Sequence, residues 1–155
     1  MPPVPPASRE MTTDETAIMQ ASVVAIGGRA LAITGAPGRG KSSLALALID
    51  RGAALIGDDG VSLARHGDLI IASPPPNIAG LIEVRGVGIV EYPVSAPAPL
   101  ALMLDLDSPP ERLPDNILSR LLLGVEIPCL PFDPGGIAPA VRAEHALALH
   151  GLSCG

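Results

Sequence analysis

Short hydrophobic runs, separated by glycines, prolines and charged residues, alternate along most of this chain. Residues 21–26 and 29–34 are rich in Val, Ile and Ala and flank Gly27-Gly28, which predicts two strands joined by a tight hairpin turn. Residues 61–65 and 69–72 predict a second hairpin in the same way. The pattern therefore favours a sheet built partly of hairpins.

Helices are predicted in only a few segments. Residues 41–50 predict a helix that ends at Arg51-Gly52 and is followed by a buried strand over residues 53–56. Two short helices are predicted over residues 118–123 and 138–149. The second carries an apolar stripe that would serve core packing or a subunit contact equally well.

Residues 81–90 combine strand-like spacing with glycines. Period-2 spacing puts Glu83 and Arg85 on one face of the predicted strand. A surface ion pair would explain these charges, but Gly86 and Gly88 indicate a backbone that moves or approaches a ligand closely.

The chain has 155 residues, the length of one compact domain. Residues 1–15 are rich in proline and polar side chains and bury too little apolar area to offset their ordering entropy. We therefore expect a flexible tail there, rather than a docking peptide, and one folded domain over residues 16–155.

A Gly-x-x-x-x-Gly-Lys-Ser pattern joins the predicted strand at residues 29–34 to the predicted helix at residues 41–50. Glycines let a loop turn its N–H groups inward and a helix N-terminus adds partial positive charge, so the pattern is typical of a phosphate-binding loop. Lys41, the single lysine of the chain, would reach the β- and γ-phosphates, and the Ser42 hydroxyl would bind Mg²⁺. The predicted nucleotide-binding residues are Gly35, Ala36, Pro37, Gly38, Arg39, Gly40, Lys41 and Ser42.

The charge pattern excludes some partners. With a net charge of −6 and nine of ten cationic residues being scattered arginines, the chain has no basic surface for nucleic acid.

No hydrophobic run reaches membrane length, and no N-terminal signal pattern is present. Cys129 and Cys154 lack metal-ligand spacing, which favours free thiols. We expect a soluble, cytoplasmic protein with no nucleic-acid or membrane partner.

Two aspartates follow the predicted strand at residues 53–56, where α/β sheets place their chemistry. Asp58 and Asp59 alternate in direction along an extended chain, so one can hold Mg²⁺ through water while the other accepts a proton. A polar turn closed by Gly60 is the structural alternative. The apolar run over residues 100–107 also ends in aspartates, but no further motif supports it and we rank it second.

The ordered set of residues 35–42, 57–59 and 81–89 resembles the catalytic domain of bacterial HPr kinase/phosphorylase, in a short form without the usual N-terminal domain. The resemblance covers roughly Gln20 to the chain end. It implies an α/β P-loop domain of the phosphoenolpyruvate-carboxykinase-like type, with a mixed sheet of hairpins and few helices. It also implies ATP- and Mg²⁺-dependent phosphorylation of a serine on the carrier protein HPr, the reverse phosphorolysis by inorganic phosphate, and hexamers.

The resemblance assigns roles to single residues. Asp59 would accept the serine proton, with Asp58 beside it. Lys41 would bind phosphate, and Arg112 would stabilise the transferring group. The residues that would hold Mg²⁺ are Ser42 and Glu83. Phosphoryl transfer depends mainly on positioning and charge neutralisation, which these residue types supply.

Two positions depart from the family pattern. Gln20 stands where the family has a histidine, and a glutamine cannot titrate near neutral pH. Residues 133–137 stand where the family has an Arg-Pro-Gly-Arg-Asn loop used for dephosphorylation, and they contain neither arginine. The sequence therefore predicts a kinase with weak or absent phosphorolysis.

Two other functions stay open. A small-molecule P-loop kinase would suit the loop, although such enzymes usually carry an arginine-rich lid and none is visible. A nucleotide-binding regulatory module without catalysis would explain Gln20 and the missing arginines. A GTPase is excluded, because its Asn-Lys-X-Asp element needs a second lysine.

Overall fold

The structure, a computed structural model, describes residues 15–76 and 79–153, so residues 1–14 of the predicted tail lie outside the described residues. Its elements in chain order are β1 (Thr16–Met19), β2 (Ser22–Ile26), β3 (Arg29–Thr34), α1 (Lys41–Asp50), β4 (Ala54–Gly57), β5 (Val61–His66), β6 (Leu69–Ser73), β7 (Leu81–Val84), β8 (Gly88–Glu91), β9 (Ala98–Asp105), β10 (Leu118–Leu122), β11 (Val125–Pro131) and α2 (Pro139–His150).

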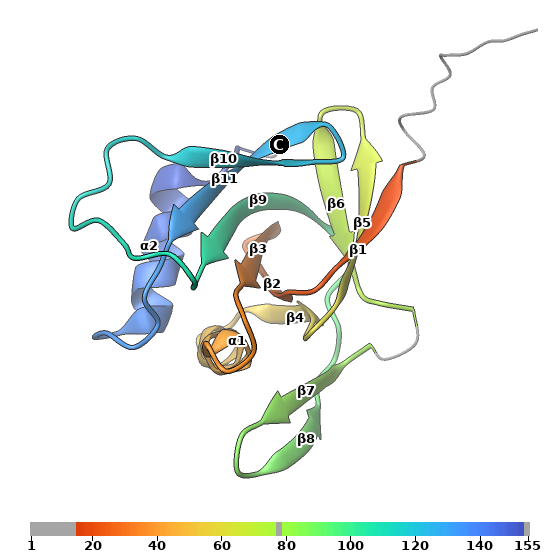
Figure 1. Cartoon of the computed structure of the whole chain (residues 1–155). Helices are drawn as coiled ribbons and strands as arrows, with labels where there is room; N and C mark the ends of the chain where they lie inside the picture. The colour runs from red at the N-terminus through yellow and green to blue at the C-terminus, as the bar shows by residue number, and fades with distance from the viewer. Residues whose placement is uncertain (1–14, 77–78, 154–155) are drawn as a thin grey trace, which may run out of the picture.

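Nine of the strands form one curled mixed sheet, while β7 and β8 form a separate hairpin that projects past α1 and β4 (Figure 1). Strand β9 is the branch point of the sheet, because it pairs parallel with β3 and β11 and antiparallel with β6. The carboxyl ends of β3, β9 and β11 therefore meet at one edge. Loops that follow parallel strands gather at such an edge, where α/β proteins bind ligands.

The two helices pack against one face of the sheet. Alternate residues of β3 face opposite sides: Leu31 and Ile33 join the hydrophobic cluster that includes both helices, whereas Ala30 and Ala32 join a second cluster on the other face. Arg51 links the helices through two 2.9 Å contacts with the carboxylate of Glu144 on α2. Helix α1, which begins at the end of the phosphate loop, therefore packs on the hydrophobic core.

The two predicted hairpins and two of the three predicted helices are confirmed. The β2–β3 and β5–β6 pairs are antiparallel hairpins, and α1 spans residues 41–50 as expected. Helix α1 ends where Gly52 adopts φ 109, a left-handed conformation that glycine takes without steric cost. The predicted helix over residues 138–149 is α2.

Two predictions are wrong. The segment predicted as a helix over residues 118–123 instead forms strand β10 (residues 118–122), which pairs antiparallel with β11 through a turn at Leu123-Gly124. Tertiary pairing there outweighs the helical preference of leucine. Residues 81–90 are a hairpin rather than one strand, with Gly86 at φ 79 and Val87 N–H donating to the Val84 carbonyl at 2.9 Å. Arg85 thus lies in the turn, not beside Glu83 on a strand face.

No helix within residues 15–76 or 79–153 is both long enough and apolar enough to cross a membrane.

Candidate functional site

The phosphate loop runs from the carboxyl end of β3 to the first turn of α1. Gly38 and Gly40 adopt φ 84 and φ 102, so the loop needs glycine at both places. The Lys41 ammonium donates to the carbonyls of Gly35 at 2.8 Å and Ala36 at 3.2 Å, which brings its charge back over the start of the loop. The sequence-predicted loop therefore connects β3 to α1, with the Lys41 ammonium folded back over its first residues.

Asp58 directly follows β4, and its carboxylate connects β2 and β7 to Ser42 of the phosphate loop. Its Oδ1 accepts hydrogen bonds from the hydroxyls of Ser42 at 2.6 Å and Ser22 at 2.7 Å. Its Oδ2 accepts the backbone N–H of Glu83 at 3.3 Å. Ser22 is fully buried in β2, next to β4 in the sheet, so the pairing of these strands sets the position of Asp58.

Asp59 is placed differently from its neighbour. It is exposed, has φ 61, and makes no hydrogen bond or ion pair with another described residue. A left-handed aspartate is uncommon and turns the chain sharply. The two carboxylates therefore lie in different surroundings: Asp58 is held beside the Ser42 hydroxyl, and Asp59 is exposed.

These residues surround one cavity of about 480 Å³. It combines the cations of Lys41 and Arg85 with three carboxylates, a mixture suited to a phosphate chain and a metal ion. The lining residues are Ser22, Pro37, Gly38, Gly40, Lys41, Ser42, Ser43, Asp58, Asp59, Glu83 and Arg85. The β7–β8 hairpin, far from the loop in sequence, supplies Glu83 and Arg85.

The donor set at this cavity fits Mg²⁺. Ser42 Oγ and Asp58 Oδ1 lie 2.6 Å apart, and both are hard oxygen ligands. Within the described part of the chain, no three Asp, Glu, His or Cys side chains group as a ready metal cage. Magnesium commonly takes one or two protein carboxylates and completes its shell with water and substrate phosphates, so Ser42 and Glu83 are suitable ligands, with Asp58 beside Ser42.

Other predicted residues lie outside this cavity. Arg112 is exposed in the connection between β9 and β10 and contacts no other described side chain through a hydrogen bond or ion pair. Gln20 lines a cavity of about 950 Å³ on another side of the loop, together with Gly35 and Ala36. Residues 133–135 line a cavity of about 440 Å³ with Arg39 and Ser43.

The loop after β11 is shaped by an arginine from α2. Arg142 donates to the carbonyls of Asp133 at 2.8 Å and Ile137 at 2.7 Å, and its guanidinium lies 4.7 Å from the centre of the Phe132 ring. Two nitrogens of Arg142 therefore hold the 133–137 loop.

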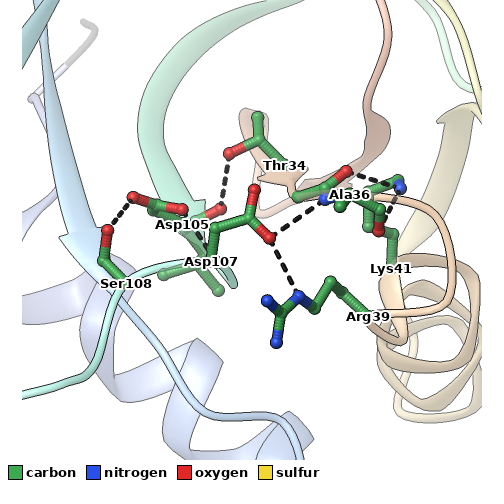
Figure 2. Close-up of polar contacts among 9 residues, drawn as sticks. Thr34, Ala36, Arg39, Lys41, Asp105, Asp107 and Ser108 are labelled. Atoms are coloured by element: carbon green, nitrogen blue, oxygen red, sulfur yellow. Dashed lines mark hydrogen bonds and ion pairs between the residues drawn. The ribbon is translucent and has the colours of Figure 1, made fainter.

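Sequence reasoning ranked the acidic end of residues 100–107 second and missed its contact with the phosphate loop. Figure 2 shows Asp107 reaching the loop from the end of β9. Its Oδ1 accepts the Ala36 N–H at 3.0 Å and lies 3.0 Å from Arg39 Nε. The sequence shows an apolar run that ends in aspartates, but only the parallel pairing of β3 with β9 brings Asp107 beside the loop.

Comparison with known proteins decides the family. The model of the HPr serine kinase C-terminal domain matches residues 11–95, more than half of the chain. The chain belongs to this family. An HPr kinase/phosphorylase of Clostridium novyi is 31% identical over 151 residues, covering 88% of this chain and 49% of that protein. One of Pelodictyon phaeoclathratiforme is 33% identical over 132 residues, covering 74% and 39%.

A solved structure agrees with the family assignment. The Hpr(Ser) kinase/phosphatase from Coxiella burnetii superposes with a TM-score of 0.69 at 30% identity, covering 85% of this chain and 92% of that one. The predicted fold, an α/β P-loop domain with a mixed sheet, is confirmed. The chain spans about half the length of the curated relatives it matches.

Proposed function

We propose that this protein is an ATP- and Mg²⁺-dependent serine kinase that phosphorylates an HPr-like phosphocarrier protein, with weak or absent phosphorolysis. The observation that carries the proposal is the 2.6 Å contact between Ser42 of the phosphate loop and Asp58, in a cavity that also holds Lys41, Asp59 and Glu83. The cavity therefore contains residue types that phosphate, a metal ion and an acceptor hydroxyl would each need, which supports the proposal.

In the proposed reaction the acceptor serine oxygen attacks the γ-phosphorus of ATP, and the bond to the β–γ bridging oxygen breaks to release ADP. The serine proton passes to Asp59, whose exposed carboxylate has no other described partner. Lys41 and the loop N–H groups hold the phosphates against charge repulsion. Mg²⁺, when bound to Ser42 and Glu83 beside Asp58, would neutralise further charge on the β- and γ-phosphates.

Arg112 is proposed to stabilise the transferring group, as the resemblance implies. It lies outside the cavity, so this role requires the connection between β9 and β10 to bring it inward when substrates bind. A fall in kcat for Arg112→Ala, with unchanged ATP binding, would support the role.

Weak phosphorolysis follows from the charges near the loop. The reverse reaction brings inorganic phosphate against an anionic phosphoserine and needs additional positive charge or a proton donor. Gln20 supplies no titrating group, residues 133–137 contain no arginine, and Arg142 is engaged with loop carbonyls.

The homo-oligomer that the resemblance implies stays a prediction, which sedimentation would test.

Radiolabel transfer from ATP tests the proposal with three acceptors: purified HPr, a set of small metabolites, and none. Label on the HPr serine that requires Mg²⁺ is the expected result. Label on a metabolite would instead indicate a small-molecule kinase, and nucleotide binding without transfer would indicate a regulatory module. Pyrophosphate release from phosphoserine-HPr and inorganic phosphate should be far slower than the forward reaction; comparable rates would refute that part.

A further inference from the structure

One carboxylate oxygen of Asp107 serves two groups of the phosphate loop. Oδ1 accepts the backbone N–H of Ala36 at 3.0 Å and pairs with Nε of Arg39, also at 3.0 Å. Figure 2 shows Asp107 between these two partners, on the side of the loop that faces β9. An anion beside a phosphate-binding loop opposes phosphate binding unless nearby groups offset its charge, so its presence calls for an explanation.

We propose that Asp107 is a positioning residue of the phosphate loop: it holds the first peptide of the loop and orients the Arg39 guanidinium toward bound phosphate. The inference rests on the proposed function, because it concerns the binding of the phosphate donor. Asp107 itself touches no reacting atom and acts through Ala36 and Arg39.

The end of β9 holds Asp107 in place for this task. Asp105 Oδ1 accepts the Asp107 N–H at 2.9 Å, and its Oδ2 accepts the Ser108 hydroxyl at 2.6 Å. Leu106 N–H donates to the Thr34 carbonyl at 2.9 Å, which ties the same turn to the end of β3. The carboxylate therefore extends from a turn that is fixed to both parallel strands.

The contact leaves part of Arg39 available to a ligand. Asp107 engages Nε, and neither terminal nitrogen of Arg39 donates to another described residue. Arg39 lines the cavity of about 440 Å³, which shares Gly38, Gly40 and Ser43 with the 480 Å³ cavity and so lies along the same loop. A guanidinium fixed by Nε can present its two terminal nitrogens as a fork, the geometry that suits a phosphate.

Besides Asp107, the first half of the loop is held by the Arg39 N–H, which donates to the Ala36 carbonyl at 3.2 Å, and by Lys41. The Gly35 carbonyl and the Ala36 carbonyl both accept from Lys41, whose ammonium a bound phosphate would also attract. If that lysine turns to a ligand, Asp107 remains as the side chain that keeps Ala36 in position. Preorganisation of this kind lowers the entropy cost of binding.

Binding of ATP and of pyrophosphate, measured by titration calorimetry on the whole chain, tests the inference. Asp107→Ala should weaken both by about five- to tenfold, since the lost contacts are charged but half exposed. Asp107→Asn keeps an acceptor oxygen and should stay within about twofold. In kinase assays Asp107→Ala should raise the KM for ATP more than it lowers kcat. Asp115→Ala, an exposed carboxylate in the same connection, is the matched control and should change nothing.

Two further measurements separate positioning from a general structural effect. Amide exchange at Ala36, followed by NMR, should become about tenfold faster in Asp107→Ala and stay slow in Asp107→Asn. In an Arg39→Ala background, Asp107→Ala should cost less affinity than it does alone, because the pair acts together.

The alternatives give different results. Tighter binding by both Asp107 variants would show that the carboxylate only repels phosphate, and unchanged binding with a lowered Tm would show a purely structural role; either overturns the inference. If the unchanged protein binds neither ATP nor pyrophosphate, the proposed function fails, while Ala36 exchange still decides whether Asp107 holds the loop.

Discussion

Replacing Asp59 by asparagine separates activity from stability more cleanly than any other change at this site. The side chain is exposed, has no described partner, and sits at φ 61. Asparagine tolerates this left-handed conformation at least as well as aspartate. We therefore expect the free energy of unfolding to stay within about 0.5 kcal/mol of the unchanged protein. Loss of a general base should lower kcat by about a hundredfold or more.

Asp58→Asn is the informative comparison. It weakens two short hydroxyl contacts, at 2.6 and 2.7 Å, that now go to a charged oxygen. An amide oxygen still accepts, so we expect a loss of about 1–2 kcal/mol, or roughly 3–6 °C in Tm for a domain of this size. Because Asp58 lies beside the proposed metal ligand, the Mg²⁺ concentration needed for half-maximal activity should also rise.

The assay is label transfer from ATP to the HPr serine across a range of Mg²⁺ concentrations, with thermal unfolding of each variant by circular dichroism. Asp68→Asn, an exposed carboxylate in the β5–β6 turn, serves as the control and should behave like the unchanged protein. Near-normal turnover by Asp59→Asn together with an inactive but folded Asp58→Asn would refute the assignment and move the base to Asp58.

Further predictions concern Lys41 of the phosphate loop, Gly57 at the end of β4 and the thiol of Cys129. Lys41→Ala should lower turnover by at least about a hundredfold and weaken ATP binding, as calorimetry would measure; full activity would exclude the loop as the phosphate site. Gly57→Ala should lower Tm by about 3–10 °C, because its Cβ would overlap the carbonyl oxygen of Gly60, whereas Gly60→Ala, with open space around its Cβ, should not; equal Tm values would contradict this. Burial and, secondarily, the charge of Asp105 raise the pKa of the Cys129 thiol, so less thiolate is present at neutral pH. In a Cys154→Ser variant, iodoacetamide should thus react slowly until the pH is raised or urea is added; rapid reaction of folded protein at pH 7 would refute it.

The features that the sequence alone determined are those whose causes lie within a few neighbouring residues. Gly38, Gly40 and Lys41 specify a strand-to-helix loop because left-handed glycines and a helix start are local properties. The Gly27-Gly28 turn likewise determines the β2–β3 hairpin. The placement of Asp58 after a strand was also readable, because the apolar run and the acidic end are adjacent.

The tertiary structure decided what depends on pairing between distant segments. Residues 118–122 form a strand only because β11 lies beside them, and no local pattern of leucines reveals that partner. Asp58 meets the buried Ser22 hydroxyl across 36 residues of sequence through the β2–β4 pairing. Asp107 reaches Ala36 across 71 residues through the parallel β3–β9 register. Local propensity cannot specify such contacts, because their energy comes from burial and hydrogen bonding that exist only once the whole sheet has formed.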